Sequence, residues 1–170
     1  YNESQMGIYG GADYAFTNNY FVGMAAGYFQ SDMNFDDVTG MGGSSINYDG
    51  FQAALYGGYD DGAWYARGIG SFGLYTGDSH RFFGLVSSPL DPDGSFDATT
   101  ESFYGETGKR FAVMPHTTVT PFTGLTIAHS NVDGFTEKDP QNTGVALKVG
   151  DQSGDSLAST PGVRIEGQYG

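Results

Sequence analysis

The sequence predicts an all-β protein: an antiparallel, up-and-down transmembrane β-barrel. Three observations predict this fold. Apolar residues recur with a period of two, short and long connections alternate along the chain, and acidic residues gather in the long connections. The 170 residues include 28 Gly, 13 Phe and 12 Tyr. Glycine at this density argues against helices, because each glycine inside a helix costs about 1 kcal/mol.

The first four expected strands show the alternation clearly. Residues 4–15 place Met, Ile, Ala and Tyr on one parity and Gln and Asp on the other. Residues 19–32 alternate large apolar side chains with Gly and Ala, and residues 45–60 hold a run of Gly and aromatic residues. In residues 63–79, one parity begins at Trp64 and the opposite parity contains an Arg. Alternate residues of a strand face opposite sides of the sheet, so each segment has an apolar face.

The other four expected strands follow the same rule. Residues 99–113 alternate Phe with Glu and Arg, and residues 117–130 alternate Val, Pro, Leu and Ile with Thr and Ala. Residues 142–150 place Val, Leu and Val opposite Lys, and residues 156–169 place Leu, Val and Ile opposite Arg and Glu. The sequence thus predicts about eight strands.

Connection lengths distinguish a barrel from a β-sandwich. Turn-forming residues mark tight turns at 16–19, 60–62, 114–116 and 151–154, whereas 33–44, 80–98 and 131–141 are long and polar. This alternation is typical of a meander whose hairpins are short at one end of a membrane barrel and long at the other. A Greek-key sandwich gives no reason for it.

Charge placement supports a membrane barrel. The net charge is −13, and eleven of the twenty acidic residues lie in 32–45, 78–101 and 131–141. So acidic a chain is unsuited to nucleic acid, which needs clustered Lys and Arg. The apolar parities carry almost no charge except Lys109, which shares the parity of Phe103 and Phe111. Either a bulge that changes the parity or snorkelling toward the nearby turn accounts for Lys109.

Aromatic residues gather near the tight turns. Two readings are open: a membrane-interface girdle, or ordinary cross-strand pairs of hairpins. The girdle reading predicts that these side chains lie at one height on the lipid-facing side. The residues concerned are Tyr14, Phe16, Tyr20, Phe21, Tyr56, Tyr59, Trp64 and Tyr65, with Met114 and Phe122 as weaker counterparts.

Several segments together resemble one known family. They are the run GFQAALYGGY at 50–59 with AWY at 63–65, VTPFTGL at 119–125 with GFTE at 134–137, PGVRI at 161–165, and GMAAGY at 23–28. This ordered set is similar to the β-domain of bacterial autotransporters (type V secretion), over nearly the whole chain.

The resemblance implies a function and partners. It implies a translocator domain in the bacterial outer membrane, with the long acidic loops extracellular. The domain would export and display an N-terminal passenger of the same polypeptide, without catalysis or a cofactor. Its partners would be outer-membrane lipid, the passenger and the barrel-assembly machinery. Because the family barrel has roughly twelve strands, residues 1–170 are expected to form one domain that lacks strands at both ends; a small complete porin-like or adhesive barrel is the alternative.

Charges on the parity opposite the apolar one are the candidate functional residues. In a barrel they face the lumen, where opposite charges pair. Glu106 and Arg110 lie four residues apart on one strand and are treated as a candidate pair. Either these charges stabilise the wall or they contact a segment inside the barrel. The candidates are Asp13, Arg67, Glu106, Arg110, Arg164 and Glu166.

Enzymatic readings find little support. The chain has no cysteine and no G-x-S-x-G elbow. The match to G-x-G-x-x-G at 68–73 lies within a period-two run, without the following helix that a dinucleotide site needs. Ser79, His80, His129 and Ser130 leave a barrel hydrolase as the remaining catalytic alternative. No metal site is expected, because His116 lies in a short turn and the other two histidines lie near long connections.

Overall fold

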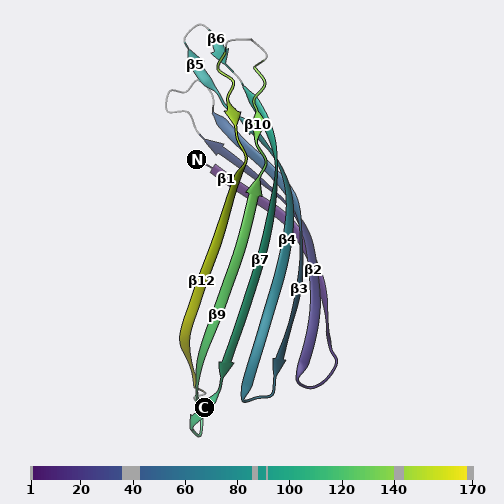
Figure 1. Cartoon of the computed structure of the whole chain (residues 1–170), viewed down its shortest axis with the longest axis vertical. Coiled ribbons are helices and arrows are strands. Elements are labelled where there is room, and N and C mark those ends of the chain that lie inside the picture. Colours follow the sequence, from purple (N-terminus) through teal and green to yellow (C-terminus); the bar gives the residue numbers. More distant parts are fainter. Residues whose placement is uncertain (1, 36–42, 86–87, 91, 140–143, 168–170) are drawn as a thin grey trace.

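The chain folds into one large, strongly curved antiparallel sheet (Figure 1). This computed structural model describes residues 2–35, 43–85, 88–90, 92–139 and 144–167. In these residues the main sheet has eight strands. They are β1 (Asn2–Ala15), β2 (Tyr20–Phe35), β3 (Ser44–Asp60), β4 (Trp64–His80), β7 (Asp93–Lys109), β8 (Phe111–Met114), β9 (Thr117–Val132) and β12 (Gln152–Gly167).

The strands follow one another across the sheet in chain order. The order is β1-β2-β3-β4-β7-β9-β12, with the short β8 paired to β9, and all neighbours are antiparallel. Short turns join the strands at one end, and long connections join them at the other (Figure 1). The up-and-down topology predicted from the connections is therefore confirmed. Among the described strands β1 and β12 are the two edges, and no ladder between them closes the sheet.

Two small ladders extend the long-connection end. β5 (Phe83–Leu85) pairs with β6 (Ser88–Leu90), and β10 (Phe135–Thr136) pairs with β11 (Lys148–Val149). The strand expected at 142–150 is wrong, because its described part contains only β11, within the connection that joins β9 to β12. Three alternating apolar residues are too few for a spanning strand, which needs about 9–11 residues. The turn expected at 151–154 is also wrong, since β12 begins at Gln152.

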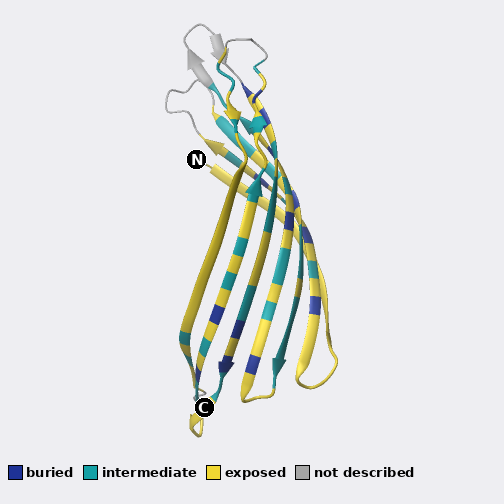
Figure 2. Cartoon of the chain, in the orientation of Figure 1, coloured by how far each residue is buried: buried dark blue, intermediate teal, exposed yellow. Residues whose placement is uncertain are grey.

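Burial distinguishes the two faces of the sheet. Along β2 every second residue is less exposed: Gly23, Gly27 and Ser31 are buried, whereas Met24 and Tyr28 are exposed. The same alternation runs along the central strands (Figure 2). Side chains crowd together on the inside of a curved sheet and spread apart on the outside. We therefore assign the less exposed set to the concave face and the more exposed set to the convex face.

The convex face carries an uncharged belt on six of its seven long strands; the exception is β7, whose convex-facing residues include Glu101 and Lys109. We define the uncharged belt as the convex-facing residues within 6–14, 20–28, 51–59, 64–74, 119–127 and 157–165, none of which is Asp, Glu, Lys, Arg or His. Each of these segments is nine residues long except 64–74, which has eleven. A tilted strand needs about 9–11 residues to cross the hydrocarbon of a membrane. The belt therefore matches the length of a transmembrane β-strand in every one of these segments.

The strands are tilted, and the register gives the angle. One row of paired residues joins Ala15 at the end of β1 to Thr160 in β12, yet β12 continues seven residues further, to Gly167. The short-turn ends thus shift by seven residues over six strand-to-strand steps. With about 3.4 Å per residue and about 4.8 Å between strands, the tilt is about 40°. Membrane barrels have tilts of about 35–45°.

Aromatic rings lie over glycines of the neighbouring strand on the concave face. The ring of Tyr65 covers Gly108, where an added Cβ would lie 2.7 Å from the ring, and Gly108 is the residue that Tyr65 pairs with across the ladder. The same arrangement recurs at several ladders. The other directly paired ring–glycine contacts are Tyr9–Gly27, Phe21–Gly58, Tyr56–Gly23, Tyr75–Gly50, Phe96–Gly77 and Phe122–Gly162.

This packing shows that part of the predicted aromatic girdle is wrong. Tyr14, Tyr20, Tyr59 and Trp64 lie on the convex face near the short turns, as the girdle requires. The ring centroids of Tyr20 and Tyr59 are 4.8 Å apart. Four of the other rings are not girdle residues, because the register turns them to the concave face, onto glycines. They are Phe21, Tyr56, Tyr65 and Phe122.

Candidate functional site: a charged cluster on the concave face

A buried carboxylate, that of Glu106 on β7, organises the concave face near the short turns. Its side chain is 4% exposed. One oxygen accepts hydrogen bonds from the Tyr65 hydroxyl and from Nη2 of Arg67, each at 2.8 Å, and the other accepts one from the Tyr104 hydroxyl at 2.6 Å. Nη2 of Arg164, on β12, lies 3.8 Å away. Two central strands, β4 and β7, are thus joined through a single carboxylate, and the edge strand β12 places Arg164 beside it.

A second ion pair lies closer to the short turns. Arg110 donates two hydrogen bonds to the carboxylate of Asp60, at 2.6 and 2.8 Å. The guanidinium carbon of Arg110 also lies 5.0 Å from the ring centroid of Tyr65. Tyr65 therefore contacts both ion pairs, with its hydroxyl on Glu106 and its ring face beside Arg110.

The predicted candidate charges share the concave face, but they do not all meet. Arg67 and Arg164 gather at Glu106. Asp13 pairs in the ladder with Gly23 at the far edge of the sheet, and Glu166 is exposed near the end of β12.

Glu106 and Arg110 do not pair with each other in the structure. Arg110 binds Asp60, and Glu106 binds Arg67. Four residues of extended strand span about 13 Å, whereas directly paired residues of neighbouring strands lie only about 5 Å apart. Arg67 is the ladder partner of Glu106, so it is the nearer cation.

Sequence reasoning missed Tyr65, Tyr104 and Asp60 as members of the cluster. Parity alone places Tyr65 and Tyr104 on the concave face, but only the register between β4 and β7 brings them to Glu106. A long connection separates these two strands in the sequence, so no tight turn fixed their register in advance. The sequence places Asp60 in a tight turn, and nothing in the sequence indicates that it is the partner of Arg110.

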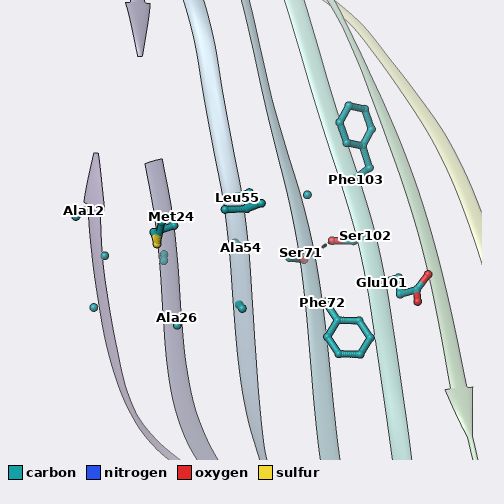
Figure 3. Close-up of a pocket in the computed structure, with 15 residues that line it drawn as sticks. Ala12, Met24, Ala26, Ala54, Leu55, Ser71, Phe72, Glu101, Ser102 and Phe103 are labelled. Carbon is teal, nitrogen blue, oxygen red and sulfur yellow. Dashed lines mark hydrogen bonds between the residues drawn. The ribbon is translucent and has the colours of Figure 1, made fainter. Parts of the chain in front are cut away.

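Above the cluster, a row of small residues crosses the concave face. Successive ladder partners in this row are Gly11, Ala25, Ala54, Ser71, Ser102, Ala128 and Ser156. A cavity of about 950 Å³ lies over its first five members and their chain neighbours. Figure 3 shows Ala54, Ser71 and Ser102 on adjacent strands, with the two serine hydroxyls 2.7 Å apart. The wall is therefore thinnest along this row, and it leaves room on the concave side.

The structure does not bring together the serines and histidines on which the hydrolase alternative depends. His80 and His129 lie on the convex face, paired with Asp93 at 3.0 Å and Asp155 at 2.7 Å. Their chain neighbours Ser79 and Ser130 lie on the concave face, because consecutive residues of a strand point to opposite sides. Each serine is thus separated from the adjacent histidine by the sheet. In the described residues no group of three or more His, Cys, Asp or Glu is placed to hold a metal ion.

Lys109 remains on the convex face. It pairs in the ladder with Trp64, and the register irregularity of the neighbouring β8 falls later, between Ala112 and Met114. No bulge therefore changes the parity at Lys109. Its ammonium lies 4.9 Å from the centroid of the Trp64 ring and 5.2 Å from that of Phe111. Of the two explanations for its parity, the structure favours the lysine reaching over the rings toward the turn.

The long connections are tied to each other by a buried ion pair. Nε and Nη2 of Arg81 donate to the two carboxylate oxygens of Glu137, whose side chain is 2% exposed. The Leu147 backbone N–H donates to the same carboxylate at 2.8 Å. The hydrogen bonds from Arg81 lower the pKa of Glu137 below its ordinary value, against the opposing effect of burial. We call this contact the connection clamp.

The tilted, curved sheet with an uncharged belt outside and a charged cluster inside is the wall of a membrane β-barrel. A model of the autotransporter β-domain family matches residues 1–170. The chain belongs to the autotransporter β-domain family. Membership implies the bacterial outer membrane, as the sequence resemblance predicted. Within the described residues no helix is long and apolar enough to cross a membrane.

Solved structures agree on the fold. The chain is similar to the translocator domain of the autotransporter NalP from Neisseria meningitidis, with a TM-score of 0.75 and 17% identity, over 96% of this chain and 54% of that one. It is also similar to the ferric yersiniabactin uptake receptor FyuA from Yersinia pestis, with a TM-score of 0.56 and 10% identity, over 96% of this chain and 25% of that one. The chain thus spans about half the length of the NalP translocator domain. A search of curated proteins found no match.

Proposed function

We propose that this chain forms part of the wall of an outer-membrane translocator barrel, which exports and displays a passenger domain of the same polypeptide. The observation that carries the proposal is the uncharged belt, whose length in six of the seven long strands fits the hydrocarbon of a membrane. Its charged and polar concave counterpart faces the lumen. The residues of this chain act as wall and anchor and take part in no catalysis.

The proposed orientation follows from the two ends of the sheet. The short turns at 16–19, 61–63 and 115–116 face the periplasm, and the long acidic connections face the cell exterior. The barrel-assembly machinery inserts the domain, and outer-membrane lipid surrounds the uncharged belt.

Further strands outside these 170 residues complete the barrel. The edges β1 and β12 present backbone N–H and C=O groups that the described strands leave unpaired. In hydrocarbon each such group costs several kcal/mol, so an open edge does not persist there. We therefore propose that residues 1–170 are one part of a single barrel domain, in agreement with the half-length match to NalP.

The concave face provides a path for the exported chain. The small-residue row leaves open volume beside the wall, and the Glu106 cluster below it keeps its charges paired rather than free in the lumen. A charged wall that is already neutralised holds a passing polypeptide less tightly than unpaired charges would. The cluster therefore stabilises the wall while the row above it makes room.

A matched pair of substitutions tests this assignment in the full-length protein. Leu55, 65% exposed, lies at the centre of the belt segment 51–59, and Leu147, 49% exposed, lies in a long connection. Arginine at the centre of a lipid-facing surface costs about 2–4 kcal/mol. Leu55→Arg should reduce the amount of a passenger epitope that external protease removes from intact cells, and Leu147→Arg should not. Equal display by both variants would show that the belt does not face lipid.

A closed small barrel is distinguished by a separate experiment. Heat-modifiable gel mobility of the 170-residue chain refolded in detergent reports a closed barrel. We expect the full-length protein to show this mobility and the 170-residue chain to lack it.

A further inference from the structure

Lys109 is exceptional among the basic residues of this chain. It is the last residue of β7, and its ladder partner is Trp64 on the convex face, at the short-turn end of the uncharged belt. The other basic residues of the described strands that cross the belt, Arg67 and Arg164, lie on the concave face, and Arg110, between β7 and β8, binds the concave-face Asp60. Among the described residues, Lys109 is thus the only lysine or arginine that the belt region turns outward.

The rings beside Lys109 stabilise its charge but leave its hydrogen-bond donors unused. The ammonium lies 4.9 Å from the Trp64 ring centroid and 5.2 Å from that of Phe111, within the range of cation–π contacts. A ring face accepts no ordinary hydrogen bond, and an ammonium carries three N–H donors. In the part of the chain that the structure describes, no hydrogen bond or ion pair of Lys109 is found.

The two acidic residues of the turn before Trp64, Asp60 and Asp61, are already engaged. The carboxylate of Asp60 accepts both hydrogen bonds from Arg110. Asp61 accepts the backbone N–H groups of Ala63 and Trp64, at 2.8 and 2.6 Å, and a hydrogen bond from a tyrosine hydroxyl. Each acid of this turn has partners of its own, and no carboxylate among the described residues forms an ion pair with Lys109.

We propose that Lys109, Trp64 and Phe111 form a binding site for the phosphate of an anionic glycerophospholipid, in the membrane leaflet at the short-turn end of the sheet. This inference rests on the proposed function, which places the uncharged belt in a membrane. Trp64 and Phe111 are 49% and 45% exposed, so both rings are free to contact the glycerol and the first acyl carbons. The ammonium above them donates to the phosphate oxygens. An anionic headgroup neutralises Lys109, whereas a zwitterionic headgroup brings a competing cation of its own.

The test follows the fluorescence of Trp64 in the full-length protein, folded into bilayers of phosphatidylcholine and phosphatidylglycerol. This chain contains a single tryptophan, so subtracting the spectrum of a Trp64→Phe protein isolates its signal. Brominated forms of each lipid quench a tryptophan that they touch, and the quenching gives their relative affinity. A basic residue at an anionic surface is worth about 1 kcal/mol, so phosphatidylglycerol should be preferred about fivefold at low salt.

Variants and salt then decide the outcome. Lys109→Gln should abolish the preference and Lys109→Arg should keep it, each measured against its own Trp64→Phe background. Lys148→Gln, which removes an exposed lysine of a long connection, should leave the preference unchanged. The preference of the wild-type protein should also fall as salt rises, because salt screens an exposed charge; this arm needs no variant at Lys109.

The results separate this inference from the proposed function. A wild-type protein that folds in the bilayer but shows no preference, or one that Lys109→Gln or salt leaves intact, overturns the lipid site alone. A full-length protein that shows no heat-modifiable mobility in bilayers overturns the proposed function, and the lipid site with it.

Discussion

Replacing Glu106 by alanine should destabilise the folded protein substantially. The substitution removes a carboxylate whose side chain is 4% exposed and that accepts hydrogen bonds from Tyr65, Tyr104 and Arg67. Tyr65 is only 5% exposed, so its hydroxyl would lose its acceptor without reaching water, which costs about 1–3 kcal/mol. The small cavity that remains adds about 1 kcal/mol. The expected loss of unfolding free energy is about 3 kcal/mol.

Arg67 and Tyr104 should contribute little to this loss. The Arg67 side chain is 52% exposed and regains water once its partner is gone. The value of about 3 kcal/mol therefore depends on the burial of Tyr65 and of the carboxylate itself. Glu106→Gln, which keeps the volume and one acceptor oxygen, should lose less than Glu106→Ala.

The measurement is a urea titration of the full-length protein folded in lipid bilayers, with the folded fraction read from heat-modifiable gel mobility. Glu166→Ala is the matched control. Glu166 is a concave-face glutamate that is exposed and makes no hydrogen bond within the described residues, so its loss should change stability by less than about 0.5 kcal/mol. If Glu106→Ala and Glu166→Ala have equal effects, the buried cluster does not stabilise the wall.

Two further predictions concern the ring–glycine contacts and the connection clamp. Gly108→Val should cost about 1–3 kcal/mol in the same titration, because its Cβ would displace the Tyr65 ring. Gly10→Val, where nothing lies within 4 Å of an added Cβ, should cost much less, and equal costs would contradict the packing argument. Because its pKa is lowered in the folded state, Glu137 stabilises the clamp above its ordinary pKa of 4.5, and this contribution is lost as pH falls through the folded value. Hydrogen exchange of the Leu147 amide, corrected for intrinsic rate, should accelerate on acidification in the wild-type protein but not in Glu137→Gln; identical profiles would refute the clamp's role.

The alternating pattern predicted most of the fold because each long strand has one apolar face. The short turns fixed the hairpins at 16–19 and 61–63, and the strands around them appear within a few residues of the expected limits. The pattern failed at 142–150 because three alternating apolar residues also suit a short ladder in a connection. Alternation alone does not distinguish a spanning strand from β11; the number of repeats does.

The candidate site was predicted less completely, because parity identifies a face but not a neighbour. The six charged candidates share the concave face, yet the partner of Glu106 depends on which residue of β4 lies opposite it. That register is set across a long connection, by packing between strands rather than by a turn. Tyr65 illustrates the difficulty: its place beside a tight turn suggests a girdle residue and its parity points to the concave face, but only the register brings its ring onto Gly108 and its hydroxyl to Glu106.

The ring–glycine contacts supply positional information that hydrophobic alternation lacks. A slip of one residue between strands exchanges the two faces, and the membrane opposes it. A slip of two residues leaves every side chain on its proper face, so polarity does not detect it. It would, however, move the Tyr9 ring from Gly27 onto Ala25 or Phe29, where side-chain atoms occupy the space. Because such contacts recur at several ladders, they stabilise one register among the several that the alternation of polar and apolar residues alone would allow.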